Sequence, residues 1–154
     1  MMLLTILKGA AAGAAGTTAL NATTYLDMTV RARPTSSTPE DTVEKLAEVS
    51  HLNIPGEGEE RDNRVAGLGP LSGIVTGVGV GALLGLIRAL GWRPPLALGA
   101  AAATLVALVG ANGPMAALGI SDPRTWSAQD WAADVVPHLA YGLVTAATLD
   151  GLDA

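Results

Sequence analysis

Long apolar stretches alternate with short polar ones along this chain, and four apolar stretches match the thickness of a bilayer. They occupy residues 2–28, 66–90, 95–118 and 128–149. Because a transmembrane helix needs about 20 mainly apolar residues, the pattern predicts an all-α integral membrane bundle of four transmembrane helices. We expect a single membrane domain over residues 1–154, with one long polar loop at residues 29–65.

The first stretch has an alternative interpretation as a cleaved secretory signal, because small residues follow its apolar run. No cation precedes that run, however, and Lys8 lies inside it. The small-residue stretch also continues to Thr24, beyond an ordinary signal. We therefore interpret it as a membrane span.

Within the long loop, the segment PEDTVEKLAEVSHL predicts a short amphipathic helix, with Thr38 as its cap and Pro39 in its first position. Its apolar positions share one face, which we expect to lie against an apolar surface: Val43, Leu46 and Ala47. The following residues 55–63, PGEGEERDN, predict a mobile, solvated acidic linker.

The second stretch carries a glycine at every fourth position. These residues are Gly69, Gly73, Gly77, Gly81 and Gly85. Glycine costs a helix about 1 kcal/mol relative to alanine, so such a row requires a compensating gain. In a membrane that gain is close approach of two helix backbones, and we predict glycine-zipper packing, within one chain or between copies. Two surfaces offer small residues as partners: Gly9, Gly13 and Gly16 in the first stretch, and Gly99, Ala103 and Ala107 in the third.

Composition agrees with a membrane location. Hydrophobic residues make up 49% of the chain and charged residues 15%, below the usual charged share of about 25%. Most acidic residues fall in residues 27–62, so the net charge of −5 belongs mainly to the long loop. Nucleic acid is not a predicted partner. We expect the lipid bilayer, with a second copy or another membrane protein as possible partners.

Orientation follows from Lys and Arg near the span ends. Arg31, Arg33, Lys45, Arg61, Arg64 and Arg124 lie on the side of the long loop, and Lys8, Arg88 and Arg93 on the other. This bias predicts a multi-pass protein of the cell's inner membrane with loop 29–65 in the cytoplasm and both termini outside.

Polar side chains inside the spans are the candidate chemistry. Asp134, His138 and Tyr141 are spaced to share one helical face, and His138 falls near the bilayer middle. Ionisable groups at that depth suggest function, so this face is a candidate proton or ligand site. In the other interpretation, His138 bonds a freed carbonyl or Tyr141 and only stabilises the bundle. Asn112 joins the candidate site because Pro114 predicts a kinked or ended helix there.

The residues do not favour an enzyme. Cysteine is absent, His51 and His138 are the only histidines, and no HExxH, paired acidic motif or phosphate loop occurs. We predict no catalytic residues, no metal and no cofactor.

Three segments carry a family resemblance: KGAAAGAAG at residues 8–16, RARP at 31–34 and DVVPHLAYG at 134–142. With them the chain resembles small bacterial inner-membrane proteins of the YagU-like, DUF1440 type. The resemblance implies a membrane protein without a defined biochemical activity and with a link to acid tolerance. The long acidic loop and the five-glycine row depart from that family's pattern.

Two functions of different class follow. One is a non-catalytic membrane scaffold or accessory subunit that acts through glycine-mediated helix packing. The alternative is a small transporter or proton-handling protein that uses the Asp134, His138 and Tyr141 face.

Overall fold

The computed structural model describes residues 1–153, and its regular elements there are all helical. The long helices are α1 (Met2–Arg31), α3 (Glu59–Ala89), α4 (Leu96–Ala117) and α5 (Ala128–Asp153). A shorter helix, α2 (Thr38–Val49), lies in the long loop, and a 3-10 turn, η1 (Pro123–Thr125), precedes α5. All four long helices are long and apolar enough to cross a membrane. The all-α prediction with four candidate spans is therefore confirmed.

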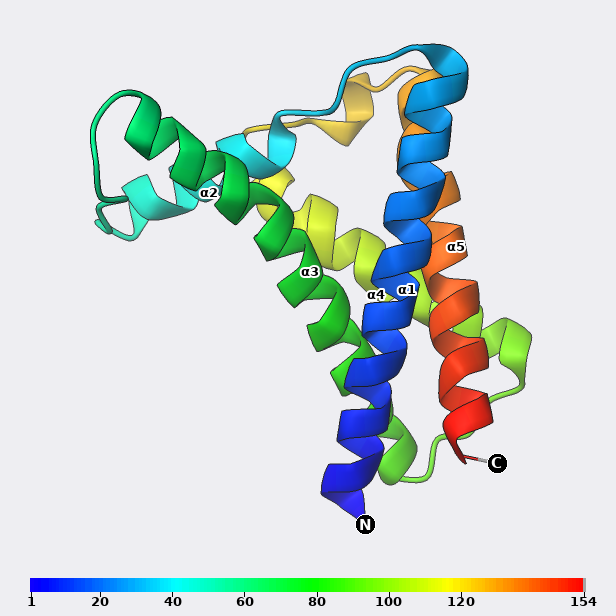
Figure 1. Cartoon of the computed structure of the whole chain (residues 1–154). Coiled ribbons are helices and arrows are strands. Elements are labelled where there is room, and N and C mark those ends of the chain that lie inside the picture. The colour runs from blue at the N-terminus through cyan, green and yellow to red at the C-terminus, as the bar shows by residue number, and fades with distance from the viewer. Residues whose placement is uncertain (154) are drawn as a thin grey trace.

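The helices form a bundle in which α1 is central (Figure 1). It packs along α3 on one side and along α5 on the other, and α4 packs mainly against α5. The N-terminus and the end of α5 lie at one end of the bundle. The connection that contains α2 and the connection from α4 to α5 lie at the opposite end (Figure 1). We call these the terminal end and the loop end.

The start of α3 corrects the sequence interpretation. Residues 59–63 are not a mobile linker but belong to the helix, which begins at Glu59. Acidic side chains fill this first turn, where they interact favourably with the positive end of the helix dipole. Two ion pairs hold the segment, one from Arg64 to Glu60 and one from Arg61 to Glu44 of α2. The acidity that suggested solvation thus stabilises a helix start.

The short helix α2 forms where it was expected, but with a different cap and a different contact face. Ser37 precedes its first residue, and Thr38 is already inside the helix. The predicted packing face is wrong, since Leu46 remains 42% exposed while Thr42 is buried. The side chain of Glu40 reaches α3, where it lies against Gly69. The contact of α2 with α3 is therefore made about one turn nearer the start of α2 than predicted, and by polar side chains.

Pro114 lies inside α4 and does not end it. We predicted that the third span would kink or end at Pro114, yet α4 continues to Ala117. Proline removes one hydrogen bond, but the chain resumes helical bonding when the amide of Leu118 donates to the carbonyl of Pro114. The end of α4 is thus set beyond the proline.

The start of α5 is fixed by a reciprocal cap between Ser127 and Asp130. The Ser127 hydroxyl accepts from the amide of Asp130 at 3.2 Å, and the Asp130 carboxylate accepts from the Ser127 amide at 2.9 Å. Beside this cap, Trp126 and Trp131 meet edge to face with ring centroids 5.0 Å apart. The two indoles lie at the level expected of an interfacial aromatic belt.

Candidate functional site

Helices α1 and α3 contact each other closely through glycines on both helices. A Cβ added at Gly81 would lie 2.5 Å from the Cα of Gly13, and one added at Gly9 would lie 2.8 Å from the Cα of Gly85. A Cβ at Gly13 would also meet the carbonyl oxygen of Gly77. Neither backbone could approach the other this closely if either side carried a methyl group. The glycines therefore permit direct backbone packing.

Not all of the predicted row takes part in this contact. Gly77, Gly81 and Gly85 face α1, whereas Gly73 is exposed and a Cβ there would meet nothing within 4 Å. Gly69 is buried, but its neighbour is Glu40 of α2. Within this chain, Gly73 therefore lies outside the glycine contact. The reason is geometric, because a row spaced by four residues is inclined to the helix axis and a crossing helix follows only part of it.

Tyr141 joins α5 to the contact between α1 and α3. It is 1% exposed, and its hydroxyl donates a 2.6 Å hydrogen bond to the carbonyl oxygen of Gly77. On α1, Gly16 provides the space for Tyr141 and for Thr145, since a Cβ there would lie 2.9 Å from a ring carbon of Tyr141. Tyr141 thus links α5 to α3 by a hydrogen bond, and its ring packs beside Gly16 of α1. It does not complete the predicted face with Asp134 and His138.

A different small-residue contact joins α4 and α5. A Cβ at Gly142 would lie 2.5 Å from the carbonyl oxygen of Ala100 and would also meet the hydroxyl of Thr104. Ala103 and Ala107 are buried on the same helix. The third span therefore uses its small residues against the fourth. At Gly99 the approach is looser, since an added Cβ would lie 3.6 Å from the Cβ of Ala146.

Asp134 is the centre of the polar group that the structure assembles inside the spans. Its Oδ2 accepts a 2.8 Å hydrogen bond from the amide of Asn112 on α4. Its Oδ1 lies 3.4 Å from Nδ1 of His138, and that nitrogen lies 2.7 Å from the carbonyl oxygen of Asp134. Because a carbonyl oxygen only accepts, the short distance implies that Nδ1 carries a hydrogen.

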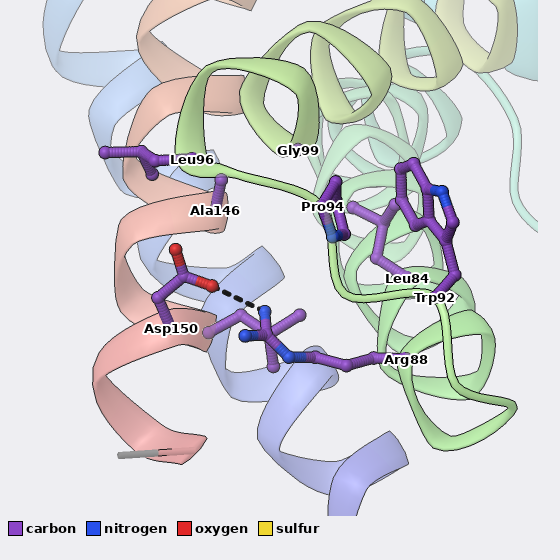
Figure 2. A pocket seen from close by; sticks show the side chains of 9 residues that line it. Leu84, Arg88, Trp92, Pro94, Leu96, Gly99, Ala146 and Asp150 are labelled. Carbon is purple, nitrogen blue, oxygen red and sulfur yellow. Dashed lines mark ion pairs between the residues drawn. The ribbon is translucent and has the colours of Figure 1, made fainter.

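The terminal end of the bundle is joined by ion pairs. Asp153 of α5, with its side chain 9% exposed, contacts Arg88 of α3 at 2.7 Å and Lys8 of α1 at 3.2 Å. Arg88 also pairs with Asp150 at 2.6 Å, at the edge of an apolar cleft that includes Trp92 and Leu84 (Figure 2). The cleft measures about 20 Å³, which is room for about one water molecule. These charges therefore connect three helix ends.

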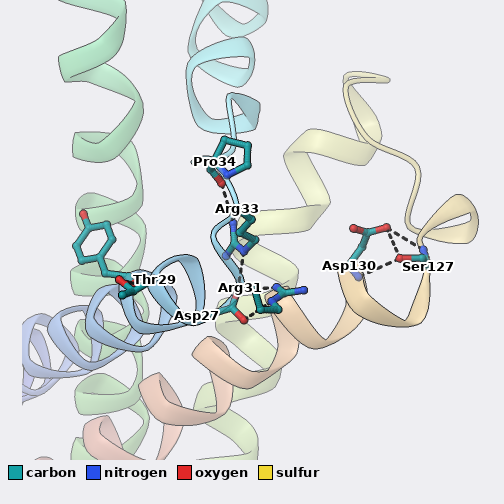
Figure 3. A network of polar contacts seen from close by, with 8 residues as sticks. Asp27, Thr29, Arg31, Arg33, Pro34, Ser127 and Asp130 are labelled. Carbon is teal, nitrogen blue, oxygen red and sulfur yellow. Dashed lines mark hydrogen bonds and ion pairs between the residues drawn. The ribbon is translucent and has the colours of Figure 1, made fainter.

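The loop end carries a second charged group (Figure 3). Asp27 accepts two hydrogen bonds of 2.6 Å from the Arg31 guanidinium and a third, also 2.6 Å, from Arg33. In the connection before α5, Arg124 hydrogen-bonds Asp122 and holds the pKa of that carboxyl below its usual value. We did not identify either group from the sequence. In both groups, however, the acid and its arginines are only two to six residues apart in the chain.

Metal chemistry finds no support in the described part of the chain. Across residues 1–153, no three His, Cys, Asp or Glu side chains gather as metal ligands would.

Comparisons of the chain with protein-family models, with curated proteins and with solved structures give no match. The resemblance to YagU-like membrane proteins stays a prediction.

Proposed function

We propose that the chain is a non-catalytic multi-pass protein of the bacterial inner membrane that acts as a scaffold or accessory subunit. The observation that carries this proposal is the bond from Tyr141 to the carbonyl of Gly77, set among the glycine contacts of α1 and α3. Here a polar side chain in the middle of the spans joins helices and is 1% exposed. Such a use of polar groups is typical of structural packing in membranes.

The surfaces left for a partner lie outside this contact. On α4, Leu105 and Val109 are each 63% exposed, and on α3, Val75 is 63% exposed. Lipid or another membrane helix would cover these apolar side chains. The glycines of α3 that face α1 are already occupied within the chain, so a partner would bind the outer faces of α3 and α4.

Cross-linking in intact native membranes tests this role. We expect a cross-linked product that contains a second membrane protein in fixed ratio to the chain. Leu105→Trp together with Val109→Trp should reduce that product, while Leu143→Trp, on the exposed side of α5, should leave it unchanged. Recovery of the uncross-linked chain alone would contradict the proposal.

Placement of the long loop in the cytoplasm is part of the same proposal. The chain has no cysteine, so single cysteines at Ser36 and Ser127 report on the loop end without background. We expect a membrane-impermeant thiol reagent to label both cysteines only after the cells are permeabilised, which gives the reagent access to the cytoplasm. Labelling of intact cells at either position would reverse the orientation.

One observation favours a second candidate, proton handling. Asp134, Asn112 and His138 meet across α4 and α5 within hydrogen-bond or ion-pair distance, and His138 is 8% exposed. A carboxylate and an imidazole together at membrane depth can exchange a proton.

Reconstituted vesicles separate the two candidates. For proton handling, His138→Gln should keep the stability of the bundle and abolish a pH-dependent flux. If wild-type vesicles show no such flux, or if His138→Gln lowers the unfolding temperature, the polar group is structural and the first candidate stands alone.

A further inference from the structure

Helix α2 leaves apolar side chains exposed in its second half and just beyond it. Leu46, Val49 and Leu52 are 42%, 51% and 70% exposed. Leu46 and Val49 are three residues apart, so they share one face of the helix. Asp41 and Glu48 are also exposed, about a third of a turn away around the helix axis. The exposed surface of α2 is therefore divided into an apolar side and an acidic side.

The end of α2 and the loop after it hold this apolar side in place. The amide of Leu52 donates to the carbonyl of Ala47 at 2.9 Å, and His51 between them has a left-handed φ of 53°. This is a Schellman motif, which ends the helix and directs Leu52 back toward its last turns. Arg64 of α3 then donates to the carbonyl of Pro55 at 2.9 Å. Together with the ion pair between α2 and α3, these contacts fix the rotation of α2 with its apolar side uncovered.

The position of α2 along α3 sets its depth in a membrane. A Cβ at Gly69 would lie 3.1 Å from the backbone nitrogen of Glu40, so α2 begins beside this turn of α3. Gly69 and Arg88 are 19 residues apart, which is about 29 Å along the helix axis. A hydrocarbon core is about 30 Å thick. With the charged group of Arg88 at one boundary of the core, Gly69 and the start of α2 therefore lie at the other.

The arrangement in Figure 1 agrees with this depth. Helix α2 lies beside the first half of α3, at the height of the last turns of α1 and not beyond them. In the turn of α3 that contacts α2, Leu68 is 38% exposed and Leu71 is 50% exposed. These side chains face lipid if α3 crosses a membrane. Since the exposed apolar side chains of α2 lie at the same level, the same medium covers them.

We infer that α2 is an interfacial helix whose apolar side contacts lipid. Leu46, Val49 and Leu52 lie in the boundary between the headgroups and the acyl chains, and the acidic side faces water. Amphipathic helices bury such a face by about 5–10 Å in this boundary. Four acidic residues and one lysine in Thr38–Val49 give α2 no attraction to anionic lipid. The contacts with α3 hold it at the surface instead, so a neutral lipid surface is sufficient.

Nitroxide labels on single cysteines measure which medium covers each side, because the chain has no cysteine of its own. The full chain is reconstituted in phosphocholine vesicles. Each label's collision rate with oxygen, which concentrates in hydrocarbon, is compared with its collision rate with a water-soluble nickel chelate. We expect oxygen to dominate at Leu46→Cys and Val49→Cys and nickel to dominate at Asp41→Cys and Glu48→Cys. The logarithm of the ratio should therefore change sign between the two sides of α2.

Two results at Leu46→Cys and Val49→Cys would overturn the inference. Dominance of nickel would place this side in water. Protection from both reagents would mean that protein covers it, either a second copy of the chain or another partner.

The inference rests on the proposed membrane location, which a label at Val75→Cys tests separately. Val75 is 63% exposed on α3 and lies further into the span than Gly69. If oxygen dominates at Val75 while nickel dominates at Leu46 and Val49, only the interfacial helix is wrong. If nickel dominates at Val75 as well, the proposed membrane function fails with it.

Discussion

The two halves of the glycine row on α3 have the same spacing and different surroundings. Gly77, Gly81 and Gly85 lie against the α1 backbone, whereas Gly73 is exposed and Gly69 meets a side chain of α2. The difference comes from the partner. Helix α1 presents Gly9 and Gly13 to the second half of the row and nothing comparable to the first. The close contact of α1 with α3 therefore depends on glycine from both helices, and spacing on one helix is not sufficient for it.

The largest effect is expected from Gly81→Leu. The new side chain would begin 2.5 Å from the Cα of Gly13, and because both neighbours are backbone, neither can move aside. We expect the free energy of unfolding in detergent to fall by more than about 3 kcal/mol, as for severe overpacking. Gly79→Leu is the matched control, since a Cβ at Gly79 meets nothing within 4 Å. Equal loss in the two variants would refute the two-sided contact.

A smaller loss is expected from Gly142→Ala, at a contact with glycine on only one side. The added methyl meets the carbonyl of Ala100 at 2.5 Å and the hydroxyl of Thr104. Because α4 packs mainly on α5, it can shift outward, and we expect about 1–3 kcal/mol of destabilisation. Denaturant titration in detergent measures it. A loss greater than that of Gly81→Leu would place the tightest contact between α4 and α5 instead.

Removing the hydroxyl that links α5 to the row should have a modest effect. Tyr141→Phe deletes the bond to the carbonyl of Gly77 and keeps the ring in its cavity. Hydrogen bonds between membrane helices contribute about 0.6 kcal/mol on average and up to about 1.7, so we expect a loss in that range. A loss above 3 kcal/mol on the same titration would show that Tyr141 has a further role in the core.

The smallest effect, with the opposite sign, is expected from Gly73→Ala. At this exposed position the methyl meets nothing within 4 Å, while alanine is the better helix former by about 1 kcal/mol. Thermal unfolding in detergent should show an unchanged or slightly raised midpoint. A clear decrease would mean that the first half of the row also packs against a helix, for example in a second copy of the chain.

Much of the architecture follows from pattern alone. Apolar length predicted the four spans. Small residues at fixed spacing predicted the glycine row of α3 but left its partner open between the first span, the third span and a second copy. Pattern could not place the start of α3, because acidic residues are equally compatible with a solvated linker and with a favourable first turn. It also could not show that α4 continues past Pro114, since one lost hydrogen bond leaves the helix intact when neighbouring helices support it.

The candidate site was only partly predictable for a different reason. Helical spacing places Asp134, His138 and Tyr141 on related faces, but partners on other helices decide what each side chain does. Tyr141 faces Gly77 of α3, while Asp134 faces Asn112 of α4. Pro114, two residues after Asn112, predicted a kinked or ended helix there, and nothing in the sequence indicated the direct bond of the Asn112 amide to Asp134. These pairings depend on how helices far apart in sequence pack together.

The central claim is that the second half of the glycine row packs within one chain, and equilibrium unfolding at several protein-to-detergent ratios tests it most directly. For intramolecular packing, the wild-type unfolding midpoint should not change with the protein fraction in the micelle. Gly81→Ala should lower that midpoint equally at every ratio. A midpoint that rises with protein fraction, together with a Gly81→Ala variant that dissociates into monomers of unchanged stability, would contradict the claim and assign the row to contacts between copies.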